Sequence, residues 1–449
     1  MIKIYRSLSK ESICYSEGCI NNHLEAKQIM CAIEPFIGGV VVANTCHLVG
    51  GNSSASTLYI LDGLKAMYPS KKFFIIGCNA SMSPNLFRKY GVVIDNQQKF
   101  FSPAYGLPNE ISIEDTPFIR NSGLVVIQRG CNNNCAFCNI PKLRGRSVSV
   151  PYQRIYKDIR ETTALTSNIT LVGTATTQYK SGGMRLPDLC KKILVDFPDI
   201  TLTVASAEPD SDIFLDLISF ILEHDRMEKR IENVGAQSFC NKTLRAMNNA
   251  LRTNQMEKIY HLTKDKMVFR TDVIVGFPGE TEEDFNETLA FAKKYPLNLN
   301  VLVFHPLMGS AAVDLPMQIS EEVKRARAEE LKKYSKPFSF HADSFPPEEE
   351  DLLGEFQIMG DDLGTFYNDS RLWKSLMDEL DSNGIPVAFL PSKTYKPKRQ
   401  SFLYSYRRYV KSSICERHST KDKAECGHSI DWRSFYADSY KCMLCDVEE

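Results

Sequence analysis

The chain has 449 residues, and at roughly 100–200 residues per domain this length suggests two to four domains. Hydrophobic residues make up 43% and charged residues 24%, which is an ordinary globular composition. The formal charge of −1 excludes a global electrostatic attraction to nucleic acid or membrane, although a local patch can still bind either. The sequence has no apolar run of about 18 residues and no apolar secretory signal, so we expect a cytoplasmic protein.

The 14 cysteines fall into groups that favour metal binding. Structural disulfides seldom persist in a reducing cytoplasm, so grouped cysteines are better explained there as metal ligands. Five cysteines lie in the first hundred residues, three form a tight cluster at 131–138, two are isolated, and four lie near the C-terminus.

Residues 1–108 are predicted to form a small parallel α/β domain. Residues 38–44 and 72–78 are short β-branched and aromatic runs that end in turn-forming residues, which is typical of buried parallel strands. Residues 54–69 have apolar positions at helical spacing after a Ser-rich start. This alternation favours layered strand–helix units.

Residues 117–340 contain six strand–helix units, a pattern that predicts a (βα)6-type partial TIM barrel with its chemistry at the C-terminal ends of the strands. The predicted strands are 123–130, 168–174, 199–206, 230–237, 269–277 and 297–306. The predicted helices are 153–165, 186–197, 211–224, 243–251, 281–295 and 321–336. Residues 341–350, with two prolines and a run of acids, are predicted to be a linker to a small α+β accessory module for substrate recognition at 351–449.

The strongest motif is Cys131, Cys135 and Cys138, directly after the predicted strand 123–130. Three thiolates this close together can bind three irons of a cubane iron–sulfur cluster and leave the fourth iron open for a reactive cofactor. A zinc site or an accidental cluster is the alternative. Zinc needs a fourth nearby ligand, and the flanking sequence offers none.

A second set of thiols follows the N-terminal strands. Cys46 and Cys78 end predicted strands, and Cys19 precedes a predicted helix that contains Glu25. Because such positions meet at one edge of a parallel sheet, we expect these three thiols to converge and to hold a second cubane with an open iron. Burial in an apolar core is the alternative, and it is stronger for Cys14 and Cys31.

The Cys-x3-Cys-x2-Cys spacing after a first barrel strand, with Phe137 before the third cysteine, resembles the radical S-adenosylmethionine (SAM) superfamily. Two open-iron clusters in tandem are similar to the arrangement of the radical SAM methylthiotransferases, over about residues 13–335. The stretches that carry this resemblance are 131–146 with Pro141, Arg144 and Gly145, then 171–179, 235–248, and 271–285 with Gly276, Pro278, Gly279 and Glu280.

The resemblance implies an enzyme that converts an unactivated C–H bond to C–SCH3. Such a change requires a radical, because no side chain is basic enough to remove the proton. The cluster at 131–138 would reduce SAM to a 5′-deoxyadenosyl radical. Cys19, Cys46 and Cys78 would hold an auxiliary cluster whose sulfur, methylated by a second SAM, joins the substrate carbon. The implied cofactors are therefore two [4Fe-4S] clusters and SAM, and the implied reductant is a flavodoxin or ferredoxin.

Candidate SAM contacts lie at the strand ends, where each could instead be an ordinary cap or turn residue. They are Gly173 and Thr174 for the methionine end, Ser206, Glu208 and Gln237 for the ribose or amino group, and Val275 and Gly276 for the adenine.

The sequence departs from the family near these positions. Phe304-His305 and Gly309-Ser310 stand where the family has Tyr-Ser and Gly-Thr, and Thr174 and Ala175 replace an amide pair. Residues 345–449 lack the short alternating strands of the family's C-terminal RNA-binding-type barrel. These departures affect the prediction of the acceptor more than the prediction of the reaction type.

The C-terminal module has two features of its own. Four cysteines are predicted to bind Zn²⁺, with His418 or His428 as substitutes, or else they are free surface thiols: Cys415, Cys426, Cys442 and Cys445. Residues 392–411 carry seven Lys or Arg interleaved with aromatics, and this run could follow a phosphate backbone, bind an acidic peptide, or be a solvated face.

Three functions stay open. We favour methylthiolation of a peptide or protein residue, because the RNA-type terminal domain is missing. The same reaction on a tRNA adenosine is the second hypothesis, supported by the basic-aromatic run. The third is an iron–sulfur binding or sensor protein without turnover.

Overall fold

The computed structural model describes residues 2–6, 11–17, 20–46, 57–58, 61, 64–65, 68–114, 116, 123–164, 166–209, 212–307, 309–336 and 356–358. Several sequence predictions concern residues outside these ranges: Cys19, most of the predicted helix 54–69, the basic-aromatic run 392–411, and all four predicted zinc ligands. The chain divides into two compact units, residues 1–119 with 350–449, and residues 120–349. The finer domain boundaries stay a prediction.

The first unit is built on a six-stranded sheet in the order β15-β1-β2-β3-β4-β5. Its parallel strands are β2 (Ile13–Glu17), β3 (Val40–Thr45), β4 (Lys72–Gly77) and β5 (Val92–Val93). β1 (Ile2–Arg6) runs antiparallel to β2, and β15 (Phe356–Ile358) runs antiparallel to β1. β3 and β4 confirm the two predicted strands, and they are buried along almost their whole length, as parallel strands covered on both faces must be.

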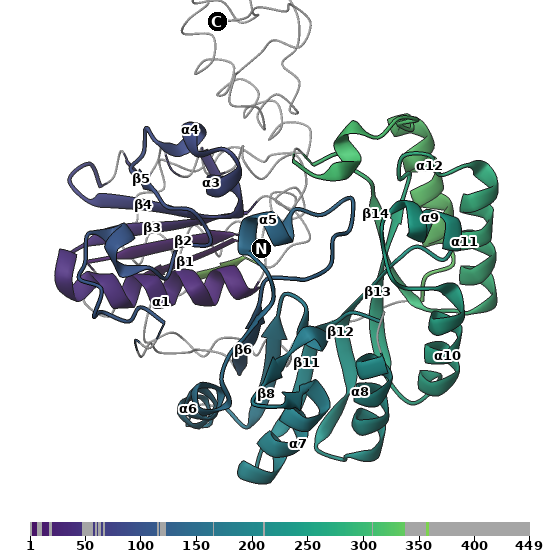
Figure 1. Cartoon of the computed structure of the whole chain (residues 1–449), viewed down its shortest axis with the longest axis horizontal. Helices are drawn as coiled ribbons and strands as arrows, with labels where there is room; N and C mark the ends of the chain where they lie inside the picture. The colour runs from purple at the N-terminus through teal and green to yellow at the C-terminus, as the bar shows by residue number, and fades with distance from the viewer. Residues whose placement is uncertain are drawn as a thin grey trace, which may run out of the picture. The chain divides into compact units, whose positions relative to one another are not determined.

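Helices connect the strands of this sheet (Figure 1). α1 (Ile20–Ile37) joins β2 to β3 and contains Glu25, as predicted. The short helices α3 (Cys78–Met82) and α4 (Pro84–Phe87) follow β4, and the 3-10 turn η1 is at Ser102–Tyr105. Apolar side chains of α1, β3 and β4 share one buried cluster with Tyr105, which packs the helix against the sheet.

The second unit contains a seven-stranded sheet in the order β14-β13-β12-β11-β8-β6-β7. Six strands are parallel: β6 (Leu124–Arg129), β8 (Asn168–Gly173), β11 (Thr201–Ala207), β12 (Met227–Gln237), β13 (Val268–Val275) and β14 (Asn298–Val303). The two-residue β7 (Val148–Ser149) pairs antiparallel with β6 at the edge, and β9 (Lys180–Ser181) with β10 (Met184–Arg185) forms a small hairpin. This order confirms the predicted partial barrel.

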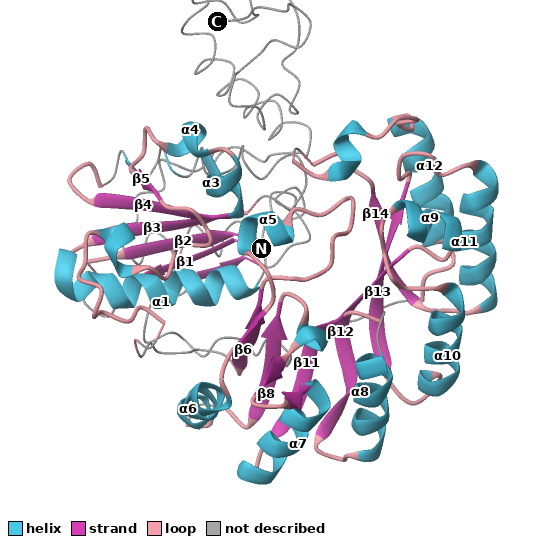
Figure 2. Ribbon diagram, in the orientation of Figure 1, coloured by secondary structure: helices cyan, strands magenta, loops and turns pink. Residues whose placement is uncertain are grey.

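The helices of the second unit lie along the outer side of the curved sheet (Figure 2). They are α6 (Tyr152–Thr162), α7 (Leu186–Asp196), α8 (Asp212–Glu223), α9 (Asn241–Ala246), α10 (Thr253–Thr263), α11 (Glu282–Lys294) and α12 (Glu321–Lys332), with α5 (Ile140–Arg144) in the loop after β6 and the 3-10 turns η2 (Thr176–Gln178) and η3 (Ala311–Asp314). One large apolar cluster fills the layer between helices and sheet. The carboxyl ends of the strands are therefore left to carry polar loops.

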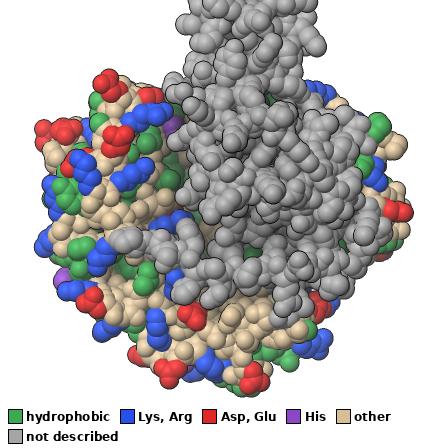
Figure 3. Space-filling model, turned by 180° about the vertical axis from the view of Figure 1, so that it is seen from behind, with side chains coloured by type: hydrophobic (Ala, Val, Ile, Leu, Met, Phe, Trp, Pro, Cys, Tyr) green, Lys and Arg blue, Asp and Glu red, His purple; other side chains and the backbone are tan. Residues whose placement is uncertain are grey.

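The surface agrees with the near-zero formal charge. On the face that Figure 3 shows, Lys and Arg side chains are interspersed with Asp and Glu over the described residues. Among the helices that the structure describes, none combines the length and the apolar composition needed to cross a membrane.

Candidate active site

The Cys131 loop begins where β6 ends, and its entry depends on a glycine. Gly130 has φ +73, and a Cβ on it would lie 2.2 Å from the carbonyl oxygen of Arg146. The returning chain is this close because the N–H of Cys131 donates to the carbonyl of Gly145 at 3.2 Å. The loop is thus a closed turn in which only glycine fits at position 130.

The thiols of this loop accept hydrogen bonds from N–H groups. Cys131 Sγ accepts from the backbone N–H of Asn133 at 3.4 Å, and Cys138 Sγ accepts from the N–H of Ile140 at 3.4 Å. Cys131, Cys135 and Cys138 are all half-buried. N–H donors favour the thiolate form, which is the form that binds iron, so this donor set fits a cubane cluster.

No three His, Cys, Asp or Glu side chains of the described residues are placed to hold a single metal ion. In a cubane cluster each thiolate binds a different iron, so its ligands need not converge on one point.

Neighbouring segments fix the loop from both sides. The N–H of Ala136 donates to the carbonyl of Met247, after α9, and the carbonyl of Ala136 accepts from the N–H of Ala312 in η3, both at 2.8 Å. Asn248 Nδ2 donates to the carbonyl of Asn134 at 2.8 Å. The three cysteines therefore stand on backbone that is held by two other segments of the same unit, residues 247–248 and η3.

Two glutamines that the sequence motifs do not single out, Gln128 and Gln178, hold the Cys131 loop by hydrogen bonds. Gln128 is fully buried on β6; its Oε1 accepts from the N–H groups of Thr174 and Ala175, and its Nε2 donates to the carbonyl of Gly130 at 2.7 Å. Gln178 accepts from the N–H of Asn132 at 2.8 Å, and its Nε2 lies 3.7 Å from Cys131 Sγ. A buried amide on a strand and a polar residue in a turn have no distinguishing sequence pattern.

The predicted SAM contacts at the ends of β8, β11 and β12 lie on the same edge of the sheet as the Cys131 loop. The carbonyl of Gly173 accepts from Ser206 Oγ at 3.2 Å, and Glu208 Oε2 accepts from Thr177 Oγ1 at 2.8 Å. Gln237 has φ +69, a left-handed conformation that non-glycine residues rarely adopt and that often marks functional strand ends.

Two of the predicted contacts have other roles in the fold. The N–H of Thr174 is taken up by Gln128, so its backbone can offer a ligand only the carbonyl, while its buried hydroxyl oxygen has no hydrogen-bond partner among the described residues. A Cβ on Gly276 would lie 2.3 Å from Cγ of Lys324, and the N–H of Gly276 donates to Glu280 Oε2 at 2.7 Å. Glycine at position 276 is thus already required by the packing of Lys324. Next to it, Phe137 packs in a small apolar cluster that includes Phe277 and Phe304.

In the first unit, Cys46 and Cys78 follow paired residues of adjacent strands. Thr45 on β3 pairs with Gly77 on β4, and each is followed directly by a cysteine. Thr45 Oγ1 donates to the carbonyl of Ile76 at 2.9 Å and accepts from the N–H of Ala80 at 2.8 Å, so one hydroxyl joins the two loops. Both thiols are buried, at the predicted edge of the sheet.

Cys14 and Cys31, for which the sequence favours burial in an apolar core, lie in one. Cys14 is fully buried on β2 within the apolar cluster of the first unit, and Cys31 packs against the same cluster. Burial raises the pKa of the Cys31 thiol to about 11 and that of Cys190 to about 12, so both stay protonated and inert.

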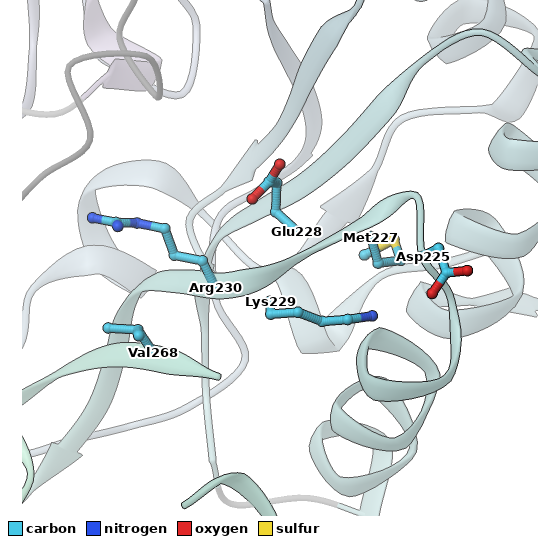
Figure 4. A pocket seen from close by; sticks show the side chains of 6 residues that line it. All are labelled: Asp225, Met227, Glu228, Lys229, Arg230 and Val268. Atoms are coloured by element: carbon cyan, nitrogen blue, oxygen red, sulfur yellow. The ribbon is translucent and has the colours of Figure 1, made fainter. Parts of the chain in front are cut away.

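A cavity at the opposite end of the barrel strands carries no cysteine. It is lined by Asp225, Met227, Glu228, Lys229, Arg230 and Val268, at the starts of β12 and β13 (Figure 4). Lys229 Nζ donates to the carbonyl of His224 at 2.7 Å and closes the end of α8. This cavity lies at the amino ends of the strands, away from the Cys131 loop.

Comparison with known proteins finds similarity to radical SAM proteins. The radical SAM superfamily model matches residues 125–292. The chain is 27% identical over 355 residues to the ribosomal protein uS12 methylthiotransferase RimO of Clostridium acetobutylicum, covering 70% of this chain and 79% of that protein. It is 27% identical over 334 residues to the tRNA-2-methylthio-N(6)-dimethylallyladenosine synthase of Thermodesulfovibrio yellowstonii, covering 67% of this chain and 75% of that protein. Among solved structures, the radical SAM methyltransferase TsrM from Kitasatospora setae aligns with a TM-score of 0.46 and 12% identity, over 58% of this chain and 63% of that one.

Proposed function

Since the chain belongs to the radical SAM methylthiotransferase family and is an enzyme of that type, we propose that it attaches a methylthio group to a carbon of a protein or peptide residue. The observation that carries this proposal is the Cys131 loop, whose three thiols stand at the carboxyl edge of a partial barrel and are held there by Gln128 and Gln178.

When bound, the two clusters and SAM supply an electron that cleaves one SAM to methionine and a 5′-deoxyadenosyl radical, and a sulfur that takes a methyl group from a second SAM and then joins the carbon radical. The 5′-deoxyadenosyl radical would take a hydrogen atom from the substrate carbon and become 5′-deoxyadenosine. One 5′-deoxyadenosine and one S-adenosylhomocysteine are therefore expected for each methylthiolated product.

The residues of this chain have the tasks of binding, orienting and protecting the reaction. Gln128 fixes the start of the cysteine loop to the turn after β8. Ser206 and Glu208 keep polar groups at the ends of β8 and β11, where the SAM ribose and amino group would lie. We propose Cys131, Cys135 and Cys138 for the cluster that cleaves SAM, and Cys19, Cys46 and Cys78 for the auxiliary cluster.

Three observations support a protein or peptide acceptor. Residues 345–449 lack the pattern of an RNA-binding-type barrel, and the overall charge is −1. One of the two relatives above is named for a ribosomal protein. We propose a flavodoxin or ferredoxin as the reductant, since a small electron carrier supplies one electron at a time.

A tRNA adenosine is the second candidate acceptor. The basic-aromatic run at 392–411 favours it, because Lys and Arg with interleaved tyrosines can follow a phosphate backbone and stack on bases. The Thermodesulfovibrio relative is also named for a tRNA product.

The test is anaerobic incubation of the reconstituted enzyme with SAM and reductant, offering total ribosomal protein and bulk tRNA in parallel. We expect a mass gain of one methylthio group in place of hydrogen on a protein chain and none on tRNA. A gain on tRNA alone would establish the second acceptor. A protein that forms no 5′-deoxyadenosine under these conditions would contradict the proposed reaction.

A further inference from the structure

A row of buried, hydrogen-bonded polar side chains in the first unit ends at the thiol of Cys78. Glu25 on α1 forms an ion pair with Lys99, with Oε2 and Nζ 2.5 Å apart and their side chains only 1% and 5% exposed. Lys99 Nζ also donates to Asn96 Oδ1 at 2.8 Å. Asn96 Nδ2 in turn lies 3.6 Å from Cys78 Sγ, within the range of an N–H···S hydrogen bond. Asn96 and Cys78 are buried as well.

Only one assignment of donors and acceptors along this row of side chains is chemically possible. A lysine ammonium only donates, so the oxygen of the Asn96 amide must face Lys99. The amide nitrogen must then face the sulfur, and Cys78 Sγ is the acceptor. The assignment of the amide therefore follows from the chemistry of Lys99 rather than from the coordinates of two similar atoms.

The ion pair is anchored independently of the thiol. The backbone carbonyl of Lys99 accepts from the hydroxyl of Tyr105 at 2.6 Å, and the N–H of Asn96 donates to Ser81 Oγ at 2.6 Å. Since Glu25 balances the charge of Lys99, the pair presents no net charge to the sulfur. The electrostatic effect on Cys78 Sγ therefore comes mainly from the dipole of the Asn96 amide, whose orientation is fixed by Lys99.

We infer that Asn96 is a positioning residue for the auxiliary cluster: it donates a hydrogen bond to the Cys78 thiolate, and the Glu25–Lys99 pair keeps its amide turned toward the sulfur. This inference rests on the proposed function, because it takes Cys78 as an auxiliary-cluster ligand. Hydrogen bonds to ligating sulfurs withdraw electron density and raise the reduction potential of iron–sulfur clusters. Asn96 therefore raises the reduction potential of the auxiliary cluster and slows the loss of the cluster from the protein.

The experiment uses the full-length chain with Cys131, Cys135 and Cys138 changed to Ala, so that the auxiliary cluster alone contributes iron. In this background, Asn96→Asp keeps an oxygen toward Lys99 but replaces the donor N–H with a second carboxylate oxygen. The readouts are the midpoint potential by redox titration, the iron content, and the rate of iron loss to a chelator. At a fixed solution potential, we expect the ratio of reduced to oxidised auxiliary cluster to fall at least tenfold, which corresponds to a midpoint potential lower by about 59 mV for one electron. We also expect the chelator to remove iron faster.

A second variant guards against misfolding. The double change Glu25→Gln and Lys99→Met removes both charges together, so that no lone buried charge is left, and it frees the Asn96 amide to turn. It is expected to shift the potential in the same direction. The matched control is Glu280→Gln with Arg327→Met, a pair of similar burial in the second unit at 2.9 Å, which should leave the potential unchanged.

The outcomes separate the two claims. A parent protein that binds no iron in this background would overturn the auxiliary-cluster assignment and the inference with it. A parent that binds a cluster whose potential and iron loss are the same in both folded variants would overturn the role of Asn96 alone.

Discussion

Gln128 Oε1 accepts the backbone N–H of Ala175 at 2.8 Å, and through this contact the strand that leads into the cysteine loop holds the turn after the next strand. The same side chain donates to the carbonyl of Gly130 at 2.7 Å. One buried amide thus joins the two segments that the proposed chemistry places around SAM.

Replacing Gln128 with Leu is expected to cost roughly 2–4 kcal/mol of stability, because it leaves the N–H groups of Thr174 and Ala175 and the carbonyl of Gly130 buried without this partner. The apoprotein's urea unfolding curve measures this. Formation of 5′-deoxyadenosine by the reconstituted variant should fall at least tenfold. The control is Gln318→Leu, an exposed amide of the same unit that also bonds two backbone carbonyls and should change neither quantity much.

Substitutions in the two cysteine groups should remove different activities. Cys131→Ala is expected to abolish SAM cleavage, because its cluster loses a ligand. Cys46→Ala should leave 5′-deoxyadenosine formation intact while removing sulfur transfer. Product analysis by mass spectrometry measures both activities in one incubation. Cys190→Ala, a fully buried core thiol, is the control for general loss of folding. Full methylthio transfer by Cys46→Ala would rule out the auxiliary-cluster assignment.

Much of the barrel could be predicted from sequence because its strands are continuous apolar runs bounded by turns. The six predicted strands coincide with β6, β8, β11, β12, β13 and β14 within a few residues. The predicted helix 243–251 instead ends at Ala246, because Asn248 turns the chain with φ +52, and the separate helix α10 follows. β1 and β2 are absent from the prediction, because their mixed polar sequences become strands only where they pair, β2 with β3 and β1 with β2.

In the candidate site, too, some residues could be predicted from the sequence and others could not. Cysteine spacing and strand ends predict where Cys46, Cys78 and the Cys131 loop lie, because parallel strands bring their carboxyl ends together. The residues that hold these loops, Gln128 and Lys99, could not be predicted. Each acts through contacts far away in sequence, 46 and 74 positions from its partner.

Gly130→Ala should disrupt the cysteine loop through a clash rather than through backbone strain alone. A methyl group there would meet the Arg146 carbonyl at 2.2 Å. Gly182→Ala is the matched control, since Gly182 also has positive φ but has nothing within 4 Å of its Cβ position. We expect the control to lose about 1 kcal/mol of stability and to retain its iron. Gly130→Ala should lose more stability and most of the iron bound at 131–138; equal iron content in the two variants would contradict the closed-turn geometry.

The stability of the second unit should depend on pH through Asp284. This carboxylate at the start of α11 accepts from Lys242 Nζ at 2.8 Å and from the N–H of Thr281 at 2.9 Å. Burial raises its pKa, but the bonds from Lys242 and Thr281 outweigh burial, and the pKa lies below the ordinary value of 3.8. A carboxylate whose folded pKa is depressed stabilises the fold above its unfolded pKa, and this contribution is lost as the pH falls through the folded value.

Asp284→Asn is therefore expected to cost about 0.5–1.5 kcal/mol at neutral pH, since a cap contact and a partly exposed ion pair are weakened. The difference in unfolding free energy between wild type and variant should shrink as the pH falls below about 3.8, the unfolded pKa of the carboxyl group. Urea unfolding of the two apoproteins from neutral to acid pH measures it. Lys242→Met removes the ion pair without touching the cap and should reproduce part of the effect. A difference that stays constant down to the acid limit would show that the charge of Asp284 contributes nothing to the fold.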